Sequence, residues 1–147
     1  AFIAKKYNET FQSYIEPAKV AAQSPDYPEA KRRNMKAAIY LAEHLHEAPV
    51  HLFVAGWTRR GAPQSQALFP AIQNILLACR AVGLGASLTT AHRAYGEEID
   101  RYIGLSEKTP SCALIPIGWP KGKYGTPTRR SIDEAFFVDQ IPEGRLD

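Results

Sequence analysis

Three histidines, His44, His46 and His51, lie close together in the chain of 147 residues, and imidazole is a common metal ligand. A zinc site needs ligands that converge on one point. His44 and His46 are two positions apart in a segment with helical periodicity, so their side chains leave the helix on different sides. We therefore interpret them as surface histidines near a helix end, where positive charge is favourable, and we predict no metal site.

His92 and Asp100, together with Ser65 or Ser87, supply the residue types of a hydrolytic triad. A nucleophile elbow of the form Gly-x-Ser-x-Gly is absent from the sequence, and no glycosidase-like carboxylate pair stands out. The sequence has no Walker loop, and Gly83-x-Gly85 follows a helix and lacks the third glycine of a dinucleotide-binding loop. The pattern therefore disfavours hydrolysis and loop-based nucleotide binding.

The composition is that of a globular protein with a mixed surface. Hydrophobic residues make up 45% and charged residues 22% of the chain, and its net charge is +3. Basic residues cluster at 31–33, 59–60 and 129–130, but acidic residues are spread among them, so we predict no nucleic-acid partner. No apolar run approaches the roughly 20 residues that cross a bilayer, so we predict no membrane association. Cys79 and Cys112 suit small core positions in a reducing, cytoplasmic protein.

Helical periodicity accounts for about half of the chain. Four helices are expected, at residues 1–22, 29–46, 66–82 and 97–103. Pro17 is expected to bend or break the first of them. Apolar residues extend around much of the third, which suggests burial on more than one side, as at a subunit interface. Gly83 follows that helix where a left-handed cap is expected.

Strands are expected between these helices. The segments with strand character are residues 50–55, 86–90, 111–117 and 135–138. Pro116 is expected to interrupt the third of them. The alternation of helices and strands predicts an α/β or α+β fold in a single domain that spans residues 1–147.

Residues 68–90 (LFPAIQNILLACRAVGLGASLTT) resemble the nitroreductase family, in which a core helix carries the pattern A-x-x-N-x-x-L-A-x-x-A-x-G-L-G. Three further segments are similar to the family. Residues 41–50 (LAEHLHEAPV) resemble its helix-to-strand junction, residues 113–120 (ALIPIGWP) a strand and turn, and residues 129–134 (RRSIDE) its basic C-terminal stretch. The order and spacing of all four segments agree with the family.

This resemblance implies an α+β fold in which a mixed sheet is flanked by helices. It also implies an intertwined homodimer with one FMN in each of two interface clefts. The N-terminal part of the family domain, which contributes an Arg- and Ser-containing stretch to the flavin site, would then be missing from this chain. The implied activity passes electrons from NAD(P)H through FMN to a nitroaromatic, a quinone or a similar acceptor. Because the cofactor performs the redox step, we expect no catalytic side chain.

The resemblance also implies which residues hold the cofactor. Leu88, Thr89 and Thr90 fall where the family places backbone and hydroxyl groups beside flavin N5 and O4. Arg129 falls where the family supplies a cation to the FMN phosphate, with Arg130 as its neighbour. From the local sequence alone, the threonines are more typical of ordinary strand residues, and the arginines are typical of an exposed loop. The resemblance to the family favours the cofactor-binding interpretation instead.

Three alternatives remain open at this stage. The chain could be a non-catalytic or flavin-free member, or a fragment, that acts as a binding or structural dimer. It could also belong to a dehalogenating or flavin-degrading branch, since residues 5–19 contain the Glu, Tyr and Lys types of the dehalogenating lid. A small nucleic-acid module would rest on the basic residues 31–33 and 59–60.

Overall fold

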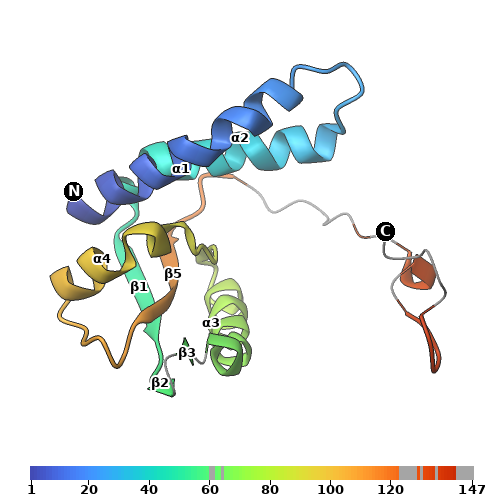
Figure 1. The fold of residues 1–147 in the computed structure, drawn as a ribbon. Helices are drawn as coiled ribbons and strands as arrows, with labels where there is room; N and C mark the ends of the chain where they lie inside the picture. The colour runs from blue at the N-terminus through green and yellow to red at the C-terminus, as the bar shows by residue number, and fades with distance from the viewer. Residues whose placement is uncertain (60–61, 64, 123–128, 130, 135, 142–147) are drawn as a thin grey trace.

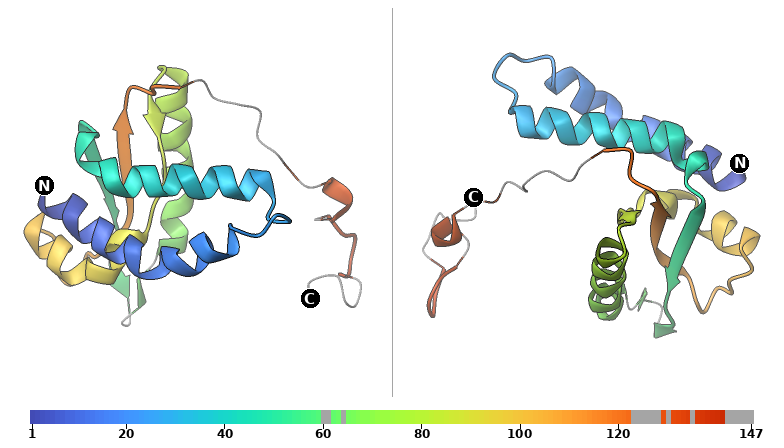
Figure 2. Two further views of the ribbon diagram at one scale, coloured as in Figure 1. Left: turned by 90° about the horizontal axis from the view of Figure 1, so that it is seen from above. Right: turned by 180° about the vertical axis from the view of Figure 1, so that it is seen from behind.

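The computed structural model describes residues 1–59, 62–63, 65–122, 129, 131–134 and 136–141. Two long helices lie side by side over one end of a small sheet, and a third long helix covers one face of that sheet (Figures 1 and 2). The α+β prediction is confirmed. No helix in the described part of the chain is both long and apolar enough to cross a membrane.

Helices α1 (Phe2–Ala21) and α2 (Glu29–His44) form the upper layer, and the 3-10 turn η1 (Leu45–Glu47) continues α2. Helix α1 does not break at Pro17, although the proline removes one hydrogen bond. Ile15 and Ala22, on either side of the proline, are buried, so tertiary packing holds this turn in place. Arg32 of α2 further anchors the end of α1, because its guanidinium donates to the carbonyl of Ala22.

The sheet has the strand order β1-β5-β4, with β1 at Val50–Ala55, β4 at Gly85–Ala86 and β5 at Ser111–Gly118. Both strand pairs are antiparallel, so the sheet is not mixed within the described residues. A two-residue hairpin, β2 (Thr58–Arg59) and β3 (Ala62–Pro63), follows β1. It lies where a loop is expected from the sequence.

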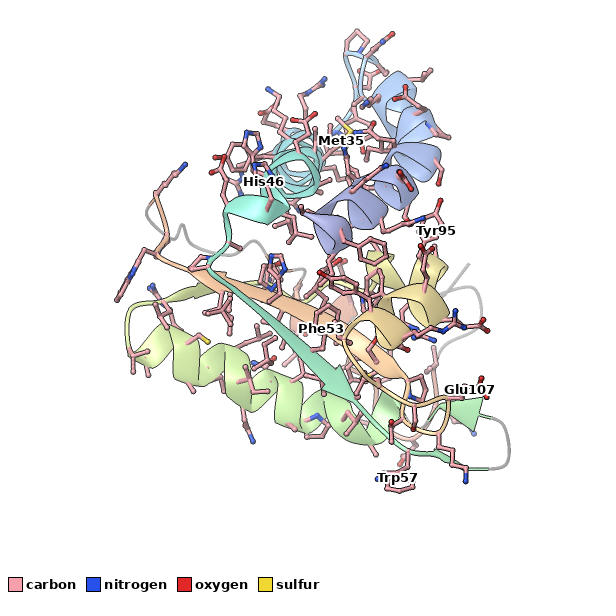
Figure 3. The ribbon with its side chains drawn as sticks, turned by 90° about the vertical axis from the view of Figure 1, so that its left-hand side faces the viewer. Met35, His46, Phe53, Trp57, Tyr95 and Glu107 are labelled. Carbon is pink, nitrogen blue, oxygen red and sulfur yellow. The ribbon has the colours of Figure 1, made fainter. Side chains whose placement is uncertain are left out.

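Successive residues of β5 point to opposite faces of the sheet and pack into two separate hydrophobic cores. Leu114 belongs to the core under α1 and α2, where Phe53 of β1 also packs (Figure 3). Ala113 and Ile115 belong to the core under α3. Residues 113–116 of β5 are all buried, which explains why this strand reads as a continuous apolar run in the sequence.

Strand β5 runs through Pro116 without the interruption expected from the sequence. Leu114 exchanges both backbone hydrogen bonds with Thr89, so its N–H faces the β4 edge. Pro116, two residues further on, aims its nitrogen at the same edge. Opposite Pro116, residues 87–88 are not paired with β5, although β4 before them and Thr89 after them are. The N–H that proline lacks would therefore have had no partner in the sheet. The strand expected at 86–90 is accordingly reduced to β4 and a single bridge at Thr89.

Helix α3 (Phe69–Ala81), preceded by the 3-10 turn η2 (Ser65–Leu68), confirms the helix expected at 66–82. It ends in a Schellman motif. Gly83 has φ +80°, its N–H donates to the Arg80 carbonyl at 3.2 Å, and the Leu84 N–H donates to the Cys79 carbonyl at 2.9 Å. Replacing Gly83 with alanine is expected to lower the free energy of unfolding by about 1–2 kcal/mol, because a Cβ strains a left-handed residue.

Chemical denaturation of Gly83→Ala and of Gly122→Ala measures this cost. Gly122 is a matched control, because its φ is not in the left-handed region and a Cβ there meets no atom within 4 Å. Equal midpoints for the two variants would contradict the prediction.

After β4, the chain forms the 3-10 turn η3 (Ala91–Tyr95) and helix α4 (Gly96–Tyr102), close to the helix expected at 97–103. The last described turn is η4 (Ile132–Glu134). The strand expected at 135–138 is wrong for its described residues 136–138, and Ala135 lies outside the described residues. Phe136 and Val138 are exposed, and no neighbouring strand of this chain pairs with them in the described part.

Candidate functional site

The segment from Gly85 to Ala91 runs along the open edge of β5. The N–H of Thr89 donates to the Leu114 carbonyl and the N–H of Leu114 donates to the Thr89 carbonyl, each at 2.9 Å. Because neighbouring residues of an extended chain aim their N–H groups at opposite edges, those of Leu88 and Thr90 point away from β5. Neither N–H has a hydrogen-bond partner in the described part of the chain. The edge thus presents two backbone donors on either side of Thr89.

The hydroxyl of Thr89, the residue between these two donors in the chain, contacts α1. Its Oγ1 is 2.8 Å from the hydroxyl oxygen of Tyr7, and the N–H of Ala91 donates to the same Oγ1 at 3.4 Å. Tyr7 is 3% exposed. Burial disfavours the phenolate and raises the pKa of Tyr7, so its hydroxyl stays protonated at neutral pH.

A groove of about 370 Å³ opens where this segment faces α1 and α2. Its walls are mostly apolar and are lined by Tyr7, Phe11, Asn34, Ala37, Ala38, Leu41, Ser87, Leu88 and Thr89. A second hollow, of about 380 Å³, shares Leu41 and Ser87 with it and extends past Tyr40 to Lys121. Thr89 and Leu88 also line a hollow on the side of Thr90. The segment therefore forms one rim of a concave surface large enough for a planar heterocycle.

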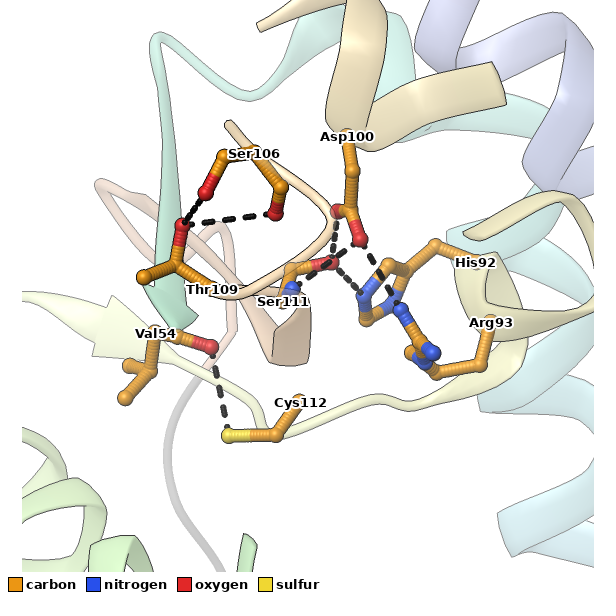
Figure 4. A network of polar contacts seen from close by, with 8 residues as sticks. All are labelled: Val54, His92, Arg93, Asp100, Ser106, Thr109, Ser111 and Cys112. Carbon is orange, nitrogen blue, oxygen red and sulfur yellow. Dashed lines mark hydrogen bonds and ion pairs between the residues drawn. The ribbon is translucent and has the colours of Figure 1, made fainter. Parts of the chain in front are cut away.

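A buried polar network behind this rim ties η3 and α4 to β5 (Figure 4). Asp100, which is 6% exposed, accepts three hydrogen bonds. They come from the Ser111 N–H at 3.1 Å, from the Ser111 hydroxyl, and from the Arg93 guanidinium at 3.1 Å. Nε2 of His92 lies 3.1 Å from the Ser111 hydroxyl oxygen. Gly96 leaves room for Arg93, since a Cβ there would lie 2.6 Å from its guanidinium.

This network is not a hydrolytic triad. Its serine is Ser111 rather than Ser87, and Ser111 lies between the histidine and the aspartate and donates to the aspartate. The side chain of Ser65 lies outside the described residues. Because Ser111 uses its hydrogen on Asp100, it accepts from His92, which therefore carries its proton on Nε2. Ser111 is 1% exposed, so the network anchors the rim segment and attacks no substrate.

His92 is neutral at physiological pH. Burial, first, and then the nearby Arg93 guanidinium lower its pKa, and the Asp100 carboxylate partly opposes them, so that the pKa is about 4. Phe53 meets the imidazole edge-on, with ring centres 5.6 Å apart. Nδ1 of His92 is buried and has no hydrogen-bond partner among the described residues.

The other histidines make local contacts. Nδ1 of His44 lies 2.9 Å from the Tyr40 carbonyl oxygen, and the two rings stack. Nε2 of His51 lies 2.8 Å from the Leu45 carbonyl oxygen. The described residues contain no group of three or more side chains of the metal-binding types that could hold an ion.

The structure brings together three of the five residues expected to bind a cofactor. Leu88, Thr89 and Thr90 share the rim, with Leu88 37% exposed, Thr89 half-buried and Thr90 exposed. Arg129 is an exposed residue of the C-terminal segment, whose turn η4 lies apart from the helices and the sheet (Figures 1 and 2). Arg130 lies outside the described residues. Within the described residues of one chain, turn η4 does not reach the rim.

A model of the nitroreductase family matches residues 3–119 of the chain. The chain belongs to the nitroreductase family. The match includes Leu88, Thr89 and Thr90 but stops before Arg129 and Arg130. The cofactor-binding roles of all five residues stay predictions. No curated protein matches this family member closely enough to count as a relative.

Several solved structures are similar to this chain in fold. An FMN- and NADPH-dependent nitroreductase, NfnB from Sphigopyxis sp. strain HMH, is 16% identical with a TM-score of 0.61, over 96% of this chain and 77% of its own. A tyrosine-to-alanine mutant of that nitroreductase matches at 20% identity and a TM-score of 0.59, over 75% of this chain. This chain covers 52% of that mutant's length, or about half. A BluB-like flavoprotein from Clostridium difficile 630 is 15% identical with a TM-score of 0.57, over 94% and 75% of the two chains. These likenesses show a shared fold.

Three residues of the site area escaped the sequence analysis. Tyr7 looks like one more apolar position of an amphipathic helix, and Ser111 and Arg93 stand in no motif. Their partners are 82, 11 and 7 residues away along the chain. The carboxylate at position 100 is the one residue type in these contacts that signals, where it is buried, that donors must lie nearby.

Proposed function

We propose that this chain is part of an FMN-dependent oxidoreductase that passes electrons from NAD(P)H to nitroaromatic, quinone or similar acceptors. The observation that carries the proposal is the rim itself. The N–H groups of Leu88 and Thr90 point away from β5 on either side of Thr89. Leu88 and Thr89 line the groove that faces α1 and α2, and Thr90 lines the neighbouring hollow. Membership in the family supports the same assignment.

The donors of the rim and the mostly apolar walls of the groove suit the binding of a flavin ring. A flavin when bound supplies the hydride chemistry at its ring N5, so no protein nucleophile is required. Reduction puts negative charge on the polar edge of the ring, and fixed N–H and O–H donors stabilise that charge. Leu88, Thr89 and Thr90 supply such donors, while Tyr7 and Phe11 line the groove and keep water from the ring.

We propose that the working unit is a homodimer in the cytoplasm. Helix α3 buries Ile72 and Cys79 but exposes the apolar side chains of Phe69 and Leu77, and Val82, which follows its last residue, is exposed as well. The C-terminal segment exposes further apolar side chains, at Ile132, Phe136, Val138 and Ile141. A second copy that covers both surfaces would bury them.

Titration of the purified chain with FMN, followed by flavin fluorescence, tests the proposal. We expect saturable binding, a yellow protein, and oxidation of NADH or NADPH that depends on both FMN and a nitroaromatic or quinone acceptor. Sedimentation at several protein concentrations is expected to give twice the chain mass. A protein that stays colourless when soaked with FMN would instead support a flavin-free structural dimer.

A further inference from the structure

Tyr7 joins helix α1 to the rim through one hydrogen bond. Its hydroxyl oxygen is 2.8 Å from Oγ1 of Thr89, 82 residues away in the chain. Tyr7 is nearly fully buried, whereas Thr89 is half-buried and lines the groove. Tyr7 therefore reaches a ligand in the groove mainly through Thr89.

The surroundings of Thr89 decide which hydroxyl donates. A threonine hydroxyl has one hydrogen and two lone pairs. The Ala91 N–H can only donate, so it uses one lone pair of Oγ1. If Tyr7 donates to the second lone pair, the Tyr7 hydrogen has an acceptor and both lone pairs of Thr89 are used. The hydrogen of Thr89 is then available to a ligand in the groove. If Thr89 donated instead, the more deeply buried Tyr7 hydrogen would have no acceptor in the described part of the chain, which is costly.

We propose that Tyr7 is a positioning residue, whose phenol donates to Thr89 and thereby turns the Thr89 hydrogen toward the ligand. The inference rests on the proposed flavin site. The ligand class that this arrangement fits is a planar heterocycle that presents a bare ring nitrogen or a carbonyl oxygen to Thr89, between the N–H groups of Leu88 and Thr90. An oxidised flavin has both acceptors on one edge. Without Tyr7, the Thr89 hydroxyl is free to rotate and to donate elsewhere.

A double-mutant cycle tests this dependence. Tyr7→Phe removes only the phenol oxygen, Thr89→Val removes the hydroxyl at nearly constant shape, and the double variant removes both. We expect Tyr7→Phe to weaken FMN binding roughly 2- to 10-fold, as for loss of one aligned hydrogen bond. Thr89→Val should weaken it at least as much. The double variant should match Thr89→Val, because Tyr7 acts only through that hydroxyl.

Tyr102→Phe is the matched control, because it removes the same atom from an exposed tyrosine outside the groove. Its FMN dissociation constant should equal that of the wild type. The absorption maximum and the reduction potential of the bound flavin should shift in Tyr7→Phe and in Thr89→Val in the same direction. Thr89→Ser, which keeps the hydroxyl, should restore wild-type values. Thermal unfolding checks each variant, and Tyr7→Met replaces Tyr7→Phe if the latter does not fold.

Two outcomes separate this inference from the proposed function. If the wild type binds FMN but the losses of Tyr7→Phe and Thr89→Val add in the double variant, or Tyr7→Phe behaves as wild type, the positioning role is overturned and the flavin site stands. A wild-type chain that binds no FMN overturns both.

Discussion

Replacing Asp100 with alanine is expected to lower the free energy of unfolding by about 2–5 kcal/mol, because it leaves two buried donors of Ser111 unpaired at about 1–3 kcal/mol each. The carboxylate is 6% exposed and accepts from Ser111 twice and from Arg93 once. Without it, the backbone N–H and the hydroxyl of Ser111 stay buried with no acceptor. Such a loss is a large share of the roughly 5–15 kcal/mol that stabilises a typical domain.

Urea denaturation followed by circular dichroism measures this loss. Glu97→Ala is the matched control, since it removes an exposed carboxylate from the same helix α4. We expect the control to change the free energy of unfolding by less than about 1 kcal/mol. Asp100→Asn should be intermediate, because its amide keeps one acceptor but turns a donor toward Ser111 or Arg93. A loss below about 1 kcal/mol in Asp100→Ala would show that the network does not support the fold.

Acidification from pH 7 to pH 4 is expected to remove stability on the order of 3 kcal/mol through His92 alone. Burial is the main cause of the lowering of its pKa to about 4, from an ordinary value near 6.5. Between these two values the unfolded imidazole takes up a proton and the folded one does not. The contribution of His92 is therefore fully present above about pH 6.5, is lost as the pH falls to about 4, and changes no further below that.

Comparison of wild type with His92→Phe isolates this contribution from that of the carboxylates. Phenylalanine fills a similar volume beside Phe53 but does not titrate, so the variant should lose less stability on acidification, by the same 3 kcal/mol in order of magnitude. Urea unfolding at several pH values between 7 and 4 gives the two slopes. His46→Gln, which removes an exposed histidine, should keep the wild-type slope. Identical slopes for His92→Phe and wild type would mean that His92 titrates normally in the folded chain.

The contrast between helix ends and the sheet shows where prediction from sequence succeeds. The glycine cap at position 83 follows from neighbouring residues, because a Schellman motif is made by bonds that span five residues or fewer. Pro17 and Pro116 were each expected to interrupt an element, and neither does. The sequence shows that each proline lacks an N–H, but it does not show what that loss costs. The cost depends on tertiary packing at Pro17 and on the strand edge that the nitrogen faces at Pro116.

The sequence by itself determined the helices, the two apolar strands and, through four ordered segments, membership in the family. Each depends on periodicity or on neighbours within a few residues. Only the tertiary structure decided that Thr89 pairs with Leu114, which turns the N–H groups of Leu88 and Thr90 outward. It also decided that Tyr7 reaches Thr89 and that Ser111 joins His92 to Asp100. These contacts join elements far apart in the chain, and their geometry is fixed by packing that no local pattern encodes.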